Sequence, residues 1–326
     1  MTNDKCRELT VAKTVDMLLS QPDWLILCHH YPDGDTLGSA FALCRALQAT
    51  GRAARVLCAD NIPDKYAYFT AEVSADEVSG EHICAVDVAD PKLLGKALEE
   101  TYADRIDLCI DHHVSNLHYA RHLLLKDYAA TAMLVLEIIR EMNVALDPVM
   151  AEALYTGIAT DSGCFKYGNT TALTHRMAAE LMDVGIRYET INREMFDIKS
   201  RARMELERMA LSGIRFACND RVALMPVTRA MIEQTNATEG DMEGLSPLPR
   251  QIEGVWIGVL LRERIAGGYK VSLRSDNRAN VSAIAQKMGG GGHVAAAGCS
   301  LNLSLEDACE RVLEAIRETV PEIERV

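Results

Sequence analysis

The chain has 326 residues, of which 48% are hydrophobic and 25% charged, so we expect a sizeable core and two domains. Its formal net charge of −13 repels long polyanions, which argues against binding along extended duplex nucleic acid. No apolar run reaches the roughly 20 residues of a membrane-spanning helix, and residues 1–10 have no signal-peptide core, so a cytoplasmic protein without membrane contact is expected.

Short apolar runs alternate with helical patterns over the first two-thirds of the chain. The runs that predict buried strands are Trp24–Cys28, Arg55–Ala59, Ile83–Val86 and Ile106–Ile110. Helices are predicted over 36–50, which Gly51 ends, and over 130–142, 148–159 and much of 173–215. Strands that alternate with helices predict an α/β fold with a mainly parallel, doubly wound sheet.

The pattern changes after about residue 215. The predicted strands there are 221–227, 255–261 and 269–274, followed by a helix over 279–288, a run of four glycines and a helix over 305–319. These elements indicate a smaller α+β domain. We therefore expect a first domain over 1–196, a helical connector over 197–215 and a second domain over 216–326.

Acidic and histidine side chains stand where apolar runs end, in four separate segments. The segments are His29–Asp35, Asp87, Asp111–His113 and Asp161. The carboxyl ends of parallel strands open onto one crevice, so residues far apart in the sequence are expected to converge there. Each segment also has a structural interpretation, because Asp33 and Asp35 suit a turn and Asp87 and Asp161 suit helix caps. Four converging segments favour a binding site over these separate explanations.

The charge of these segments indicates a metal centre. Asp33, Asp35, Asp87 and Asp161 would repel one another without cations, and some would have to protonate. Two divalent ions balance four carboxylates, and two-metal sites with ions roughly 3.5–4 Å apart hydrolyse phosphate esters. Asp87, alone at its strand end, is the predicted bridge. Imidazole and carboxylate ligands together favour Mn²⁺, with Mg²⁺ as the second choice.

The ten cysteines are scattered, and none forms a CxxC pair. Most of them stand inside apolar runs, as Cys28, Cys84 and Cys109 do. In a chain of this length, buried free thiols are a better interpretation than a disulfide framework.

The triplet Asp111-His112-His113 is the signature of the DHH phosphoesterase superfamily, which the chain resembles. The other motifs that match in order are His29-x-x-Pro32-Asp33-x-Asp35, Val86-Asp87, Thr156–Gly163, and Gly289–His293 with Ala295–Gly298. The last of them is similar to the companion DHHA1 domain. Together the motifs span nearly the whole chain, and within the superfamily the chain most resembles the bifunctional oligoribonuclease and pAp phosphatase group, the nanoRNases.

The resemblance implies a role for each residue of these motifs. In the first domain, one Mn²⁺ would be held by His29 and Asp33, the other by Asp35, His112 and Asp161, with Asp87 bridging. Asp111 would orient His112 and fix its tautomer, and His113 would point to the substrate phosphate. In the second domain, the residues implied to bind substrate are Arg274, Ser275, Gly290, Gly291, Gly292 and His293.

Two positions depart from the family pattern. Val294 follows the glycine-run histidine where many relatives carry a basic residue, and Lys166 stands where many carry arginine. Both changes are expected to alter phosphate affinity or substrate preference.

The expected reaction is hydrolysis of short oligoribonucleotides or of nucleotide phosphates such as pAp or pApA by a hydroxide that bridges the metals. The alternatives are an inorganic pyrophosphatase of the same superfamily, a RecJ-like single-strand exonuclease and a non-catalytic nucleotide sensor. The second domain argues against the pyrophosphatase, the net charge of −13 against the exonuclease, and the full ligand set against the sensor. The sequence does not rank the substrates, and it is compatible with a homodimer.

Overall fold

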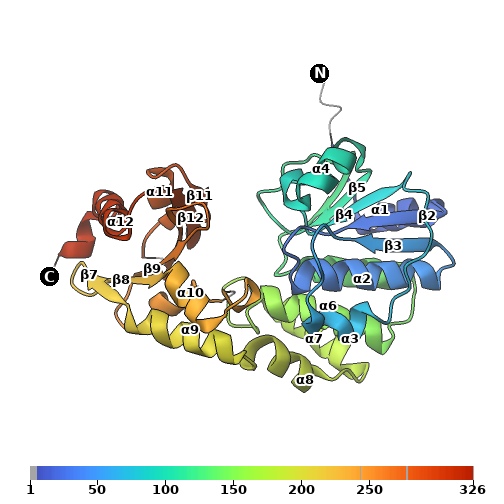
Figure 1. Cartoon of the computed structure of the whole chain (residues 1–326). Helices are drawn as coiled ribbons and strands as arrows, with labels where there is room; N and C mark the ends of the chain where they lie inside the picture. Colours follow the sequence, from blue (N-terminus) through green and yellow to red (C-terminus); the bar gives the residue numbers. More distant parts are fainter. Residues whose placement is uncertain (1–5, 243, 277, 326) are drawn as a thin grey trace. The chain divides into compact units, whose positions relative to one another are not determined.

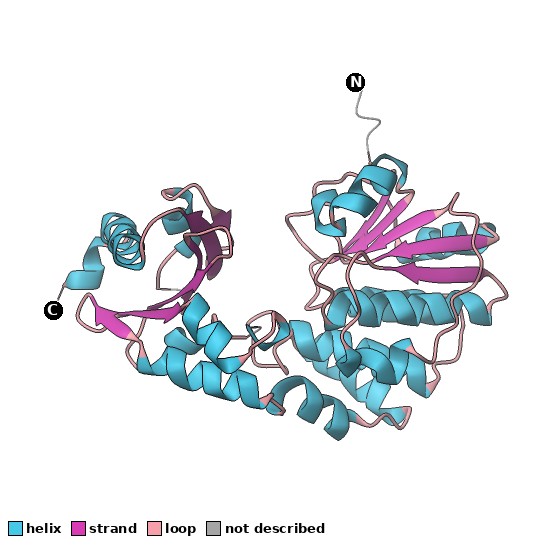
Figure 2. Ribbon diagram, viewed as in Figure 1, coloured by secondary structure: helices cyan, strands magenta, loops and turns pink. Residues whose placement is uncertain are grey.

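The computed structural model describes residues 6–242, 244–276 and 278–325. The chain forms two compact units, Met1–Ile198 and Lys199–Val326, which we call the N-terminal unit and the C-terminal unit. Each unit has its own six-stranded sheet with helices packed against it (Figures 1 and 2).

A parallel sheet organises the N-terminal unit. Its strands are β1 (Arg7–Glu8), β2 (Asp23–Leu27), β3 (Ala53–Leu57), β4 (Ile83–Val86), β5 (Leu108–Asp111) and β6 (His122–Leu125). The α-helices of the unit are α1 (Val11–Ser20), α2 (Gly34–Ala49), α3 (Ala67–Thr70), α4 (Lys96–Tyr102), α5 (Thr131–Glu141), α6 (Pro148–Asp161), α7 (Ala172–Asp183) and α8 (Tyr188–Asn192). The strand order is β1-β6-β5-β4-β2-β3, and every pairing is parallel. The carboxyl ends of β5, β4 and β2 therefore lie side by side.

Both faces of this sheet are covered, as its apolar strands require. In β2, Trp24 and Ile26 face a large core built with α1, α2, α5 and α6, whereas Leu25 and Leu27 face a smaller core beside α4. Successive side chains of a strand point to opposite faces of the sheet, so alternate residues of β2 enter different cores. Figure 1 shows α2 and α6 on one side of the sheet and α4 on the other. The doubly wound α/β architecture predicted from the sequence is confirmed.

Glycines let α2 and α6 approach closely. A Cβ at Gly34 would meet Thr160 Oγ1 at 2.5 Å, and a Cβ at Gly157 would meet Asp35 Oδ1 at 2.8 Å. Real Cβ atoms essentially never make contacts this short, so larger residues would push the helices apart. The glycines thereby bring the start of α2, which carries Asp35, beside the end of α6, which carries Asp161.

A mixed sheet organises the C-terminal unit. Its strands are β7 (Arg215–Ala217), β8 (Val222–Val227), β9 (Ile257–Glu263), β10 (Tyr269–Ser275), β11 (Gly291–Gly292) and β12 (Ala296–Leu301). Its α-helices are α9 (Arg201–Ser212), α10 (Arg229–Thr235), α11 (Val281–Gln286) and α12 (Leu305–Thr319). The strand order is β11-β12-β10-β9-β8-β7, with β8 and β9 parallel and the other neighbours antiparallel.

Two cores cover opposite faces of this second sheet. Helices α11 and α12 pack on Val271 and Leu273 of β10, and α9 packs on Met225 and Val227 of β8. This arrangement confirms the smaller α+β fold predicted for the second half of the chain.

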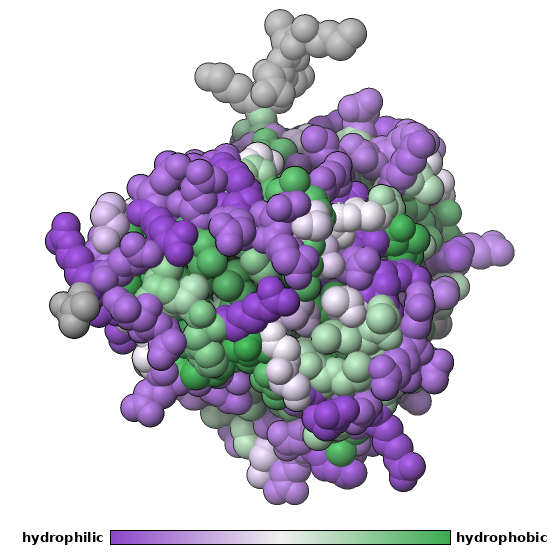
Figure 3. All heavy atoms as spheres, turned by 60° about the vertical axis from the view of Figure 1, so that its left-hand side comes forward, coloured by the Kyte–Doolittle hydropathy of each residue, from purple (hydrophilic) through white to green (hydrophobic). Residues whose placement is uncertain are grey.

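The surface is mixed in character. Hydrophilic residues cover much of the face drawn in Figure 3, with hydrophobic atoms showing between them. Among the described residues no helix is long and apolar enough to cross a bilayer. The cysteines are free, and the buried ones are Cys28, Cys44, Cys84, Cys109, Cys299 and Cys309, as the sequence predicted.

Candidate active site

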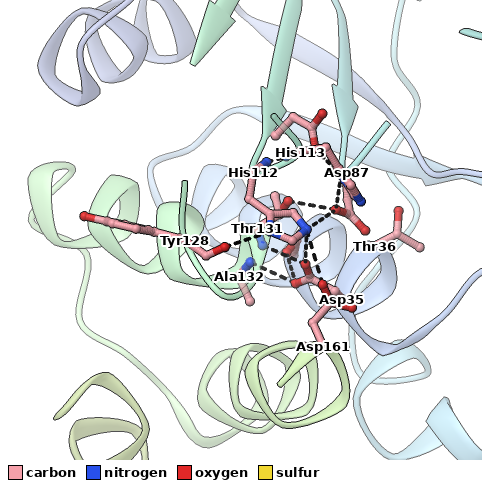
Figure 4. Close-up of polar contacts among 12 residues, drawn as sticks. Asp35, Thr36, Asp87, His112, His113, Tyr128, Thr131, Ala132 and Asp161 are labelled. Atoms are coloured by element: carbon pink, nitrogen blue, oxygen red, sulfur yellow. Dashed lines mark hydrogen bonds and ion pairs between the residues drawn. The ribbon is translucent and has the colours of Figure 1, made fainter. Parts of the chain in front are cut away.

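The predicted site residues of the N-terminal unit gather at the carboxyl edge of its parallel sheet. They follow β2, β4 and β5 or stand at the end of α6, which brings four distant segments together. Figure 4 shows Asp35, Asp87, His112 and Asp161 pointing toward one another. The side chains that form groups able to hold a metal ion are His29, Asp33, Asp35, Asp87, His112, His113 and Asp161.

His29, Asp33 and Asp87 form one of these groups. His29 Nε2 lies 3.6 Å from Asp33 Oδ1 and 3.7 Å from Asp87 Oδ2. The other ring nitrogen, Nδ1, donates to the His30 carbonyl oxygen at 2.8 Å, which leaves Nε2 as the ligand atom. Asp33 also caps α2 by accepting from two amides of its first turn. Asp33 is thus a helix cap, where the structural interpretation from the sequence was a turn residue, and capping is compatible with a ligand role.

Asp35, His112 and Asp161 form a second group. His112 Nε2 lies 3.2 Å from Asp161 Oδ2 and 4.0 Å from Asp35 Oδ2. Its Nδ1 donates to the Tyr128 carbonyl oxygen at 2.9 Å, so Nε2 presents its lone pair to the carboxylates. This nitrogen is buried and makes no hydrogen bond to any described residue. A lone pair that faces carboxylates is unfavourable unless a metal ion, or in its absence a proton, lies between the nitrogen and the carboxylates.

Asp87 belongs to the first group and also forms a third group with His112 and His113. Its Oδ2 faces His29, and its Oδ1 lies 3.6 Å from His112 Nε2, so each carboxylate oxygen is directed to a different group. The backbone of Asp87 has a φ of 61°, a left-handed conformation that costs a residue other than glycine about 1–3 kcal/mol. The turn after β4 thus holds a strained residue whose side chain points into the cluster.

The start of α5 supports both groups (Figure 4). The amides of Thr131 and Ala132 donate to the Asp35 carboxylate at 2.6 and 2.9 Å. Asp35 therefore caps α5, and the positive end of the helix dipole stabilises its charge. The Thr131 hydroxyl donates to Asp87 Oδ1 at 2.8 Å. Thr131 thus holds one carboxylate of each group, a role that the sequence analysis missed.

Asp111 orients His113 instead of His112. Its Oδ1 accepts from His113 Nδ1 at 2.8 Å, and its Oδ2 accepts from Asn116 Nδ2 at 2.7 Å. It reaches His112 only through the backbone amide, at 2.9 Å. The prediction that Asp111 fixes the tautomer of His112 is wrong, because the turn after β5 directs the carboxylate toward the ring of His113 and the Tyr128 carbonyl orients His112.

Without metal, the cluster binds protons. Burial, then the charges of Asp33 and Asp161, raise the pKa of Asp87 to about 8. Burial by itself would lower the pKa of both histidines. Contact with Asp33 instead raises the pKa of His29 to about 9, and contact with Asp161 raises the pKa of His112 to about 10. Divalent cations would displace these protons and balance the same carboxylates.

A pocket of about 300 Å³ opens onto the first group. Besides His29, Asp33, Asp87, His113 and Asp161, its lining residues are His30, Tyr31 and Leu93. His30 and Tyr31 lie in the predicted segment His29–Asp35, but the sequence assigned no binding role to either of them or to Leu93.

The C-terminal unit has a separate pocket of about 680 Å³ on β10, β12 and the glycine run. Of the residues predicted to bind substrate, Arg274, Gly291 and Gly292 line it. Lys270 and Ser272 also line it, because they lie on the same face of β10 as Arg274. This face is therefore rich in cationic and polar groups.

The other predicted substrate-binding residues lie elsewhere in this unit. Gly290 packs on β12, where a Cβ would meet the Gly298 carbonyl oxygen at 2.1 Å. Ser275 is buried, and its hydroxyl accepts from the Ala279 amide at 3.2 Å. His293 is exposed, and its amide donates to the Ala296 carbonyl oxygen at 2.7 Å. The two departures from the family pattern, Lys166 and Val294, are both exposed.

Comparisons with known proteins identify the family of the chain. The model of the DHH family, N-terminal domain, matches residues 24–158, and that of the DHHA1 domain matches residues 221–322. A Thermus thermophilus protein named bifunctional oligoribonuclease and PAP phosphatase NrnA is 35% identical over 302 residues, which cover 90% of this chain and 89% of that protein. The chain therefore belongs to the DHH and DHHA1 family of phosphoesterases, and it is a phosphoric ester hydrolase.

Solved structures share the fold. An exopolyphosphatase-related protein from Bacteroides fragilis matches 97% of this chain and 98% of its own with a TM-score of 0.88 and 23% identity. RecJ from Thermus thermophilus in complex with Mn²⁺ matches 94% of this chain and 54% of its own with a TM-score of 0.53 and 14% identity. At these identities the likeness shows the fold alone.

Proposed function

We propose that the chain is a two-metal phosphoesterase that hydrolyses short oligoribonucleotides and nucleotide phosphates such as pAp or pApA. The observation that carries this proposal is the set of overlapping potential metal-binding groups around Asp87, which directs one carboxylate oxygen toward His29 and the other toward His112. The name of the Thermus thermophilus relative, an oligoribonuclease and PAP phosphatase, supports the substrate class.

The donor set fits two divalent ions. His29, Asp33 and one oxygen of Asp87 would hold the first ion, and the residues that would hold the second are Asp35, His112, Asp161 and the other oxygen of Asp87. The buried His112 Nε2 without a hydrogen-bond partner among the described residues supports this assignment. Mixed nitrogen and oxygen ligands favour Mn²⁺, with Mg²⁺ next. When bound, such ions supply a water of lowered pKa and balance charge on the phosphoryl oxygens.

The protein orients the reacting phosphate through His113. Asp111 accepts from Nδ1 of this ring, so Nε2 is the nitrogen directed away from Asp111. We propose that this edge of the ring faces a phosphoryl oxygen of the substrate, where charge develops during the reaction. Asn116 donates to the second oxygen of Asp111 and thereby holds the pair in place.

We propose that the pocket of the C-terminal unit binds a phosphate group of a nucleotide. The Arg274 guanidinium can bind a phosphate through two donors, which a lysine cannot do with the same geometry. Gly291 and Gly292 line the same pocket, and without side chains their amides leave room for a phosphate to approach.

A substrate panel tests the proposal. Purified protein is assayed on an RNA dinucleotide, pAp, pApA, pyrophosphate and long single-stranded RNA, each with Mn²⁺, Mg²⁺ or chelator, and Asp161→Ala serves as the inactive control. We expect Mn²⁺ to support hydrolysis of the short nucleotides and chelator to abolish it. A preference for pyrophosphate or for long strands would instead identify a pyrophosphatase or a RecJ-like exonuclease. Nucleotide binding without turnover would identify a sensor.

A further inference from the structure

Tyr31 is an exposed aromatic residue at the pocket of the candidate active site. Its side chain is 70% exposed, although it lines the same pocket as His29, Asp87 and His113. By contrast, the aromatic side chains of Trp24 and Phe69 are fully buried in the core of the same unit. Covering a solvent-exposed aromatic ring with a flat apolar group is energetically favourable, because both lose apolar surface to water.

The local backbone fixes where this ring stands. Tyr31 has a φ of 52°, in the left-handed region that residues other than glycine rarely adopt. The Asp60 carboxylate accepts from the Tyr31 amide at 2.7 Å and helps to hold this conformation. The ring is tilted by 43° against that of His30, with centroids 4.5 Å apart. The His30 amide in turn donates to the Leu93 carbonyl oxygen at 2.6 Å.

The pocket therefore has two kinds of wall. One wall consists of carboxylates and imidazoles, which suit metal ions and, through them, a phosphate. The other consists of Tyr31, His30 and Leu93, whose ring faces and methyl groups offer apolar contact. A ligand that fits both walls carries a phosphate and a flat apolar ring close together, which is the chemistry of a nucleotide.

We infer that Tyr31 forms a nucleobase subsite on the N-terminal unit, where one of the bases flanking the scissile phosphate stacks on its ring. This inference rests on the proposed function, because it requires a nucleotide substrate. It adds a base-recognition role to the unit that carries the candidate metal ligands, where the family resemblance placed contacts only with the metal ions and the substrate phosphate. A purine offers a larger stacking face than a pyrimidine, so the subsite should prefer purines.

The contact exists in the bound substrate and in the transition state alike. Its loss should therefore raise KM and leave kcat unchanged, as expected for uniform binding. The expected increase in KM is between about fivefold and 150-fold, which corresponds to ~1–3 kcal/mol for one stacked base at 1.4 kcal/mol per tenfold.

The test compares variants at Tyr31 on intact and abasic dinucleotides. Tyr31→Phe keeps the ring, whereas Tyr31→Asn removes it and tolerates the left-handed backbone. Tyr188→Ala, at a partly exposed tyrosine that does not line this pocket, is the matched control. The substrates are a diadenosine dinucleotide and two analogues that each lack one base. Quenching of a fluorescent purine nucleoside monophosphate on binding gives a readout that needs no turnover.

We expect the wild type, Tyr31→Phe and Tyr188→Ala to bind one abasic analogue more weakly than the intact dinucleotide. Tyr31→Asn should bind both equally, at the level of the wild type with the abasic analogue, and should not quench the fluorescent purine. If Tyr31→Asn still distinguishes intact from abasic substrate as the wild type does, the subsite is refuted while the proposed function stands. If the wild type hydrolyses no nucleotide, both fail.

Discussion

Thr131→Val should weaken metal binding and lower the stability of the metal-free protein only slightly. Valine matches the shape of threonine but has no hydroxyl, so the variant loses the 2.8 Å hydrogen bond to Asp87 Oδ1. The amide of residue 131 is kept, and with it the 2.6 Å hydrogen bond to Asp35. The substitution therefore removes one contact to the predicted bridging carboxylate and leaves the cap of α5 in place.

The magnitude follows from the charge of Asp87. In the metal-free protein burial raises the pKa of Asp87 to about 8, and a neutral carboxyl accepts only an ordinary hydrogen bond, which contributes about 0.5–1.5 kcal/mol. With metal bound it is ionised, and the hydrogen bond becomes charge-assisted. Such bonds contribute about 1.5–3 kcal/mol, and the difference from the neutral pair of about 1–1.5 kcal/mol predicts that the variant binds Mn²⁺ roughly 5- to 10-fold more weakly.

Calorimetric titration with Mn²⁺ measures this affinity, and thermal unfolding of the metal-free protein measures stability. Thr131→Ser, which keeps the hydroxyl, should stay within a few-fold of the wild type. Thr14→Val is a matched control, since Thr14 is buried in α1 and its hydroxyl has no hydrogen-bond partner among the described residues. Thr131→Val with unchanged Mn²⁺ affinity, or Thr131→Ser as weak as Thr131→Val, would refute this account of Thr131.

Three further predictions concern pH, helix packing and substrate binding. Folding raises the pKa of Asp87 from 3.8 to about 8 and those of His29 and His112 from 6.5 to about 9 and 10. The stability that these groups contribute is complete below their pKa values in the unfolded chain and is lost as the pH rises through their pKa values in the folded protein. The melting temperature of the metal-free protein should therefore fall from pH 6.5 to 10, and saturating Mn²⁺ should flatten this profile. A melting temperature of the metal-free protein that rises over this range would contradict the prediction. Gly157→Ala places a methyl 2.8 Å from Asp35 Oδ1 and should cost about 1–3 kcal/mol in unfolding free energy, whereas Gly168→Ala, with open space around it, should be neutral in the same denaturant titration. Arg274→Ala should raise KM for a dinucleotide roughly 10- to 100-fold and hardly change hydrolysis of bis-nitrophenyl phosphate, and an equal loss on both esters would remove Arg274 from nucleotide recognition.

The sequence predicts best the strands and helices whose apolar pattern and capping residues lie within or next to the element itself. The strand over Ile83–Val86 is predicted with the same ends as β4, because its apolar residues pack on both faces of a buried parallel sheet. The helix over 305–319 likewise coincides with α12, whose N-cap Ser304 and apolar stripe stand in the sequence.

The sequence does not predict strands whose conformation depends on pairing with neighbouring strands. Strand β6, His122–Leu125, is short and follows a charged residue, and it is a strand because it pairs with β5 on one side and β1 on the other. Strand β1, Arg7–Glu8, is too short to leave a pattern. Strand β12 consists largely of small residues that a propensity scale does not assign to a strand, and its pairing with β10 decides its conformation.

The predicted metal ligands meet because parallel strands end at one edge, which is a rule that a sequence pattern can use. The contacts that orient them depend on coordinates. The donor to Asp87 is a hydroxyl 44 residues away, and the acceptor for His112 is the backbone carbonyl of Tyr128. No side-chain pattern identifies a backbone carbonyl, and no spacing rule links Thr131 to a carboxylate from a different strand.

The count of tightly bound metal ions in the wild type and in Asp87→Ala tests the central claim most directly. Both proteins are loaded with Mn²⁺, dialysed and measured by mass spectrometry, with His29→Ala as the matched variant of a residue assigned to one ion. We expect two ions per chain in the wild type, loss of both in Asp87→Ala, and loss of mainly one in His29→Ala, because each oxygen of Asp87 faces a different group. An Asp87→Ala protein that kept two ions and normal turnover would contradict the bridged two-metal site.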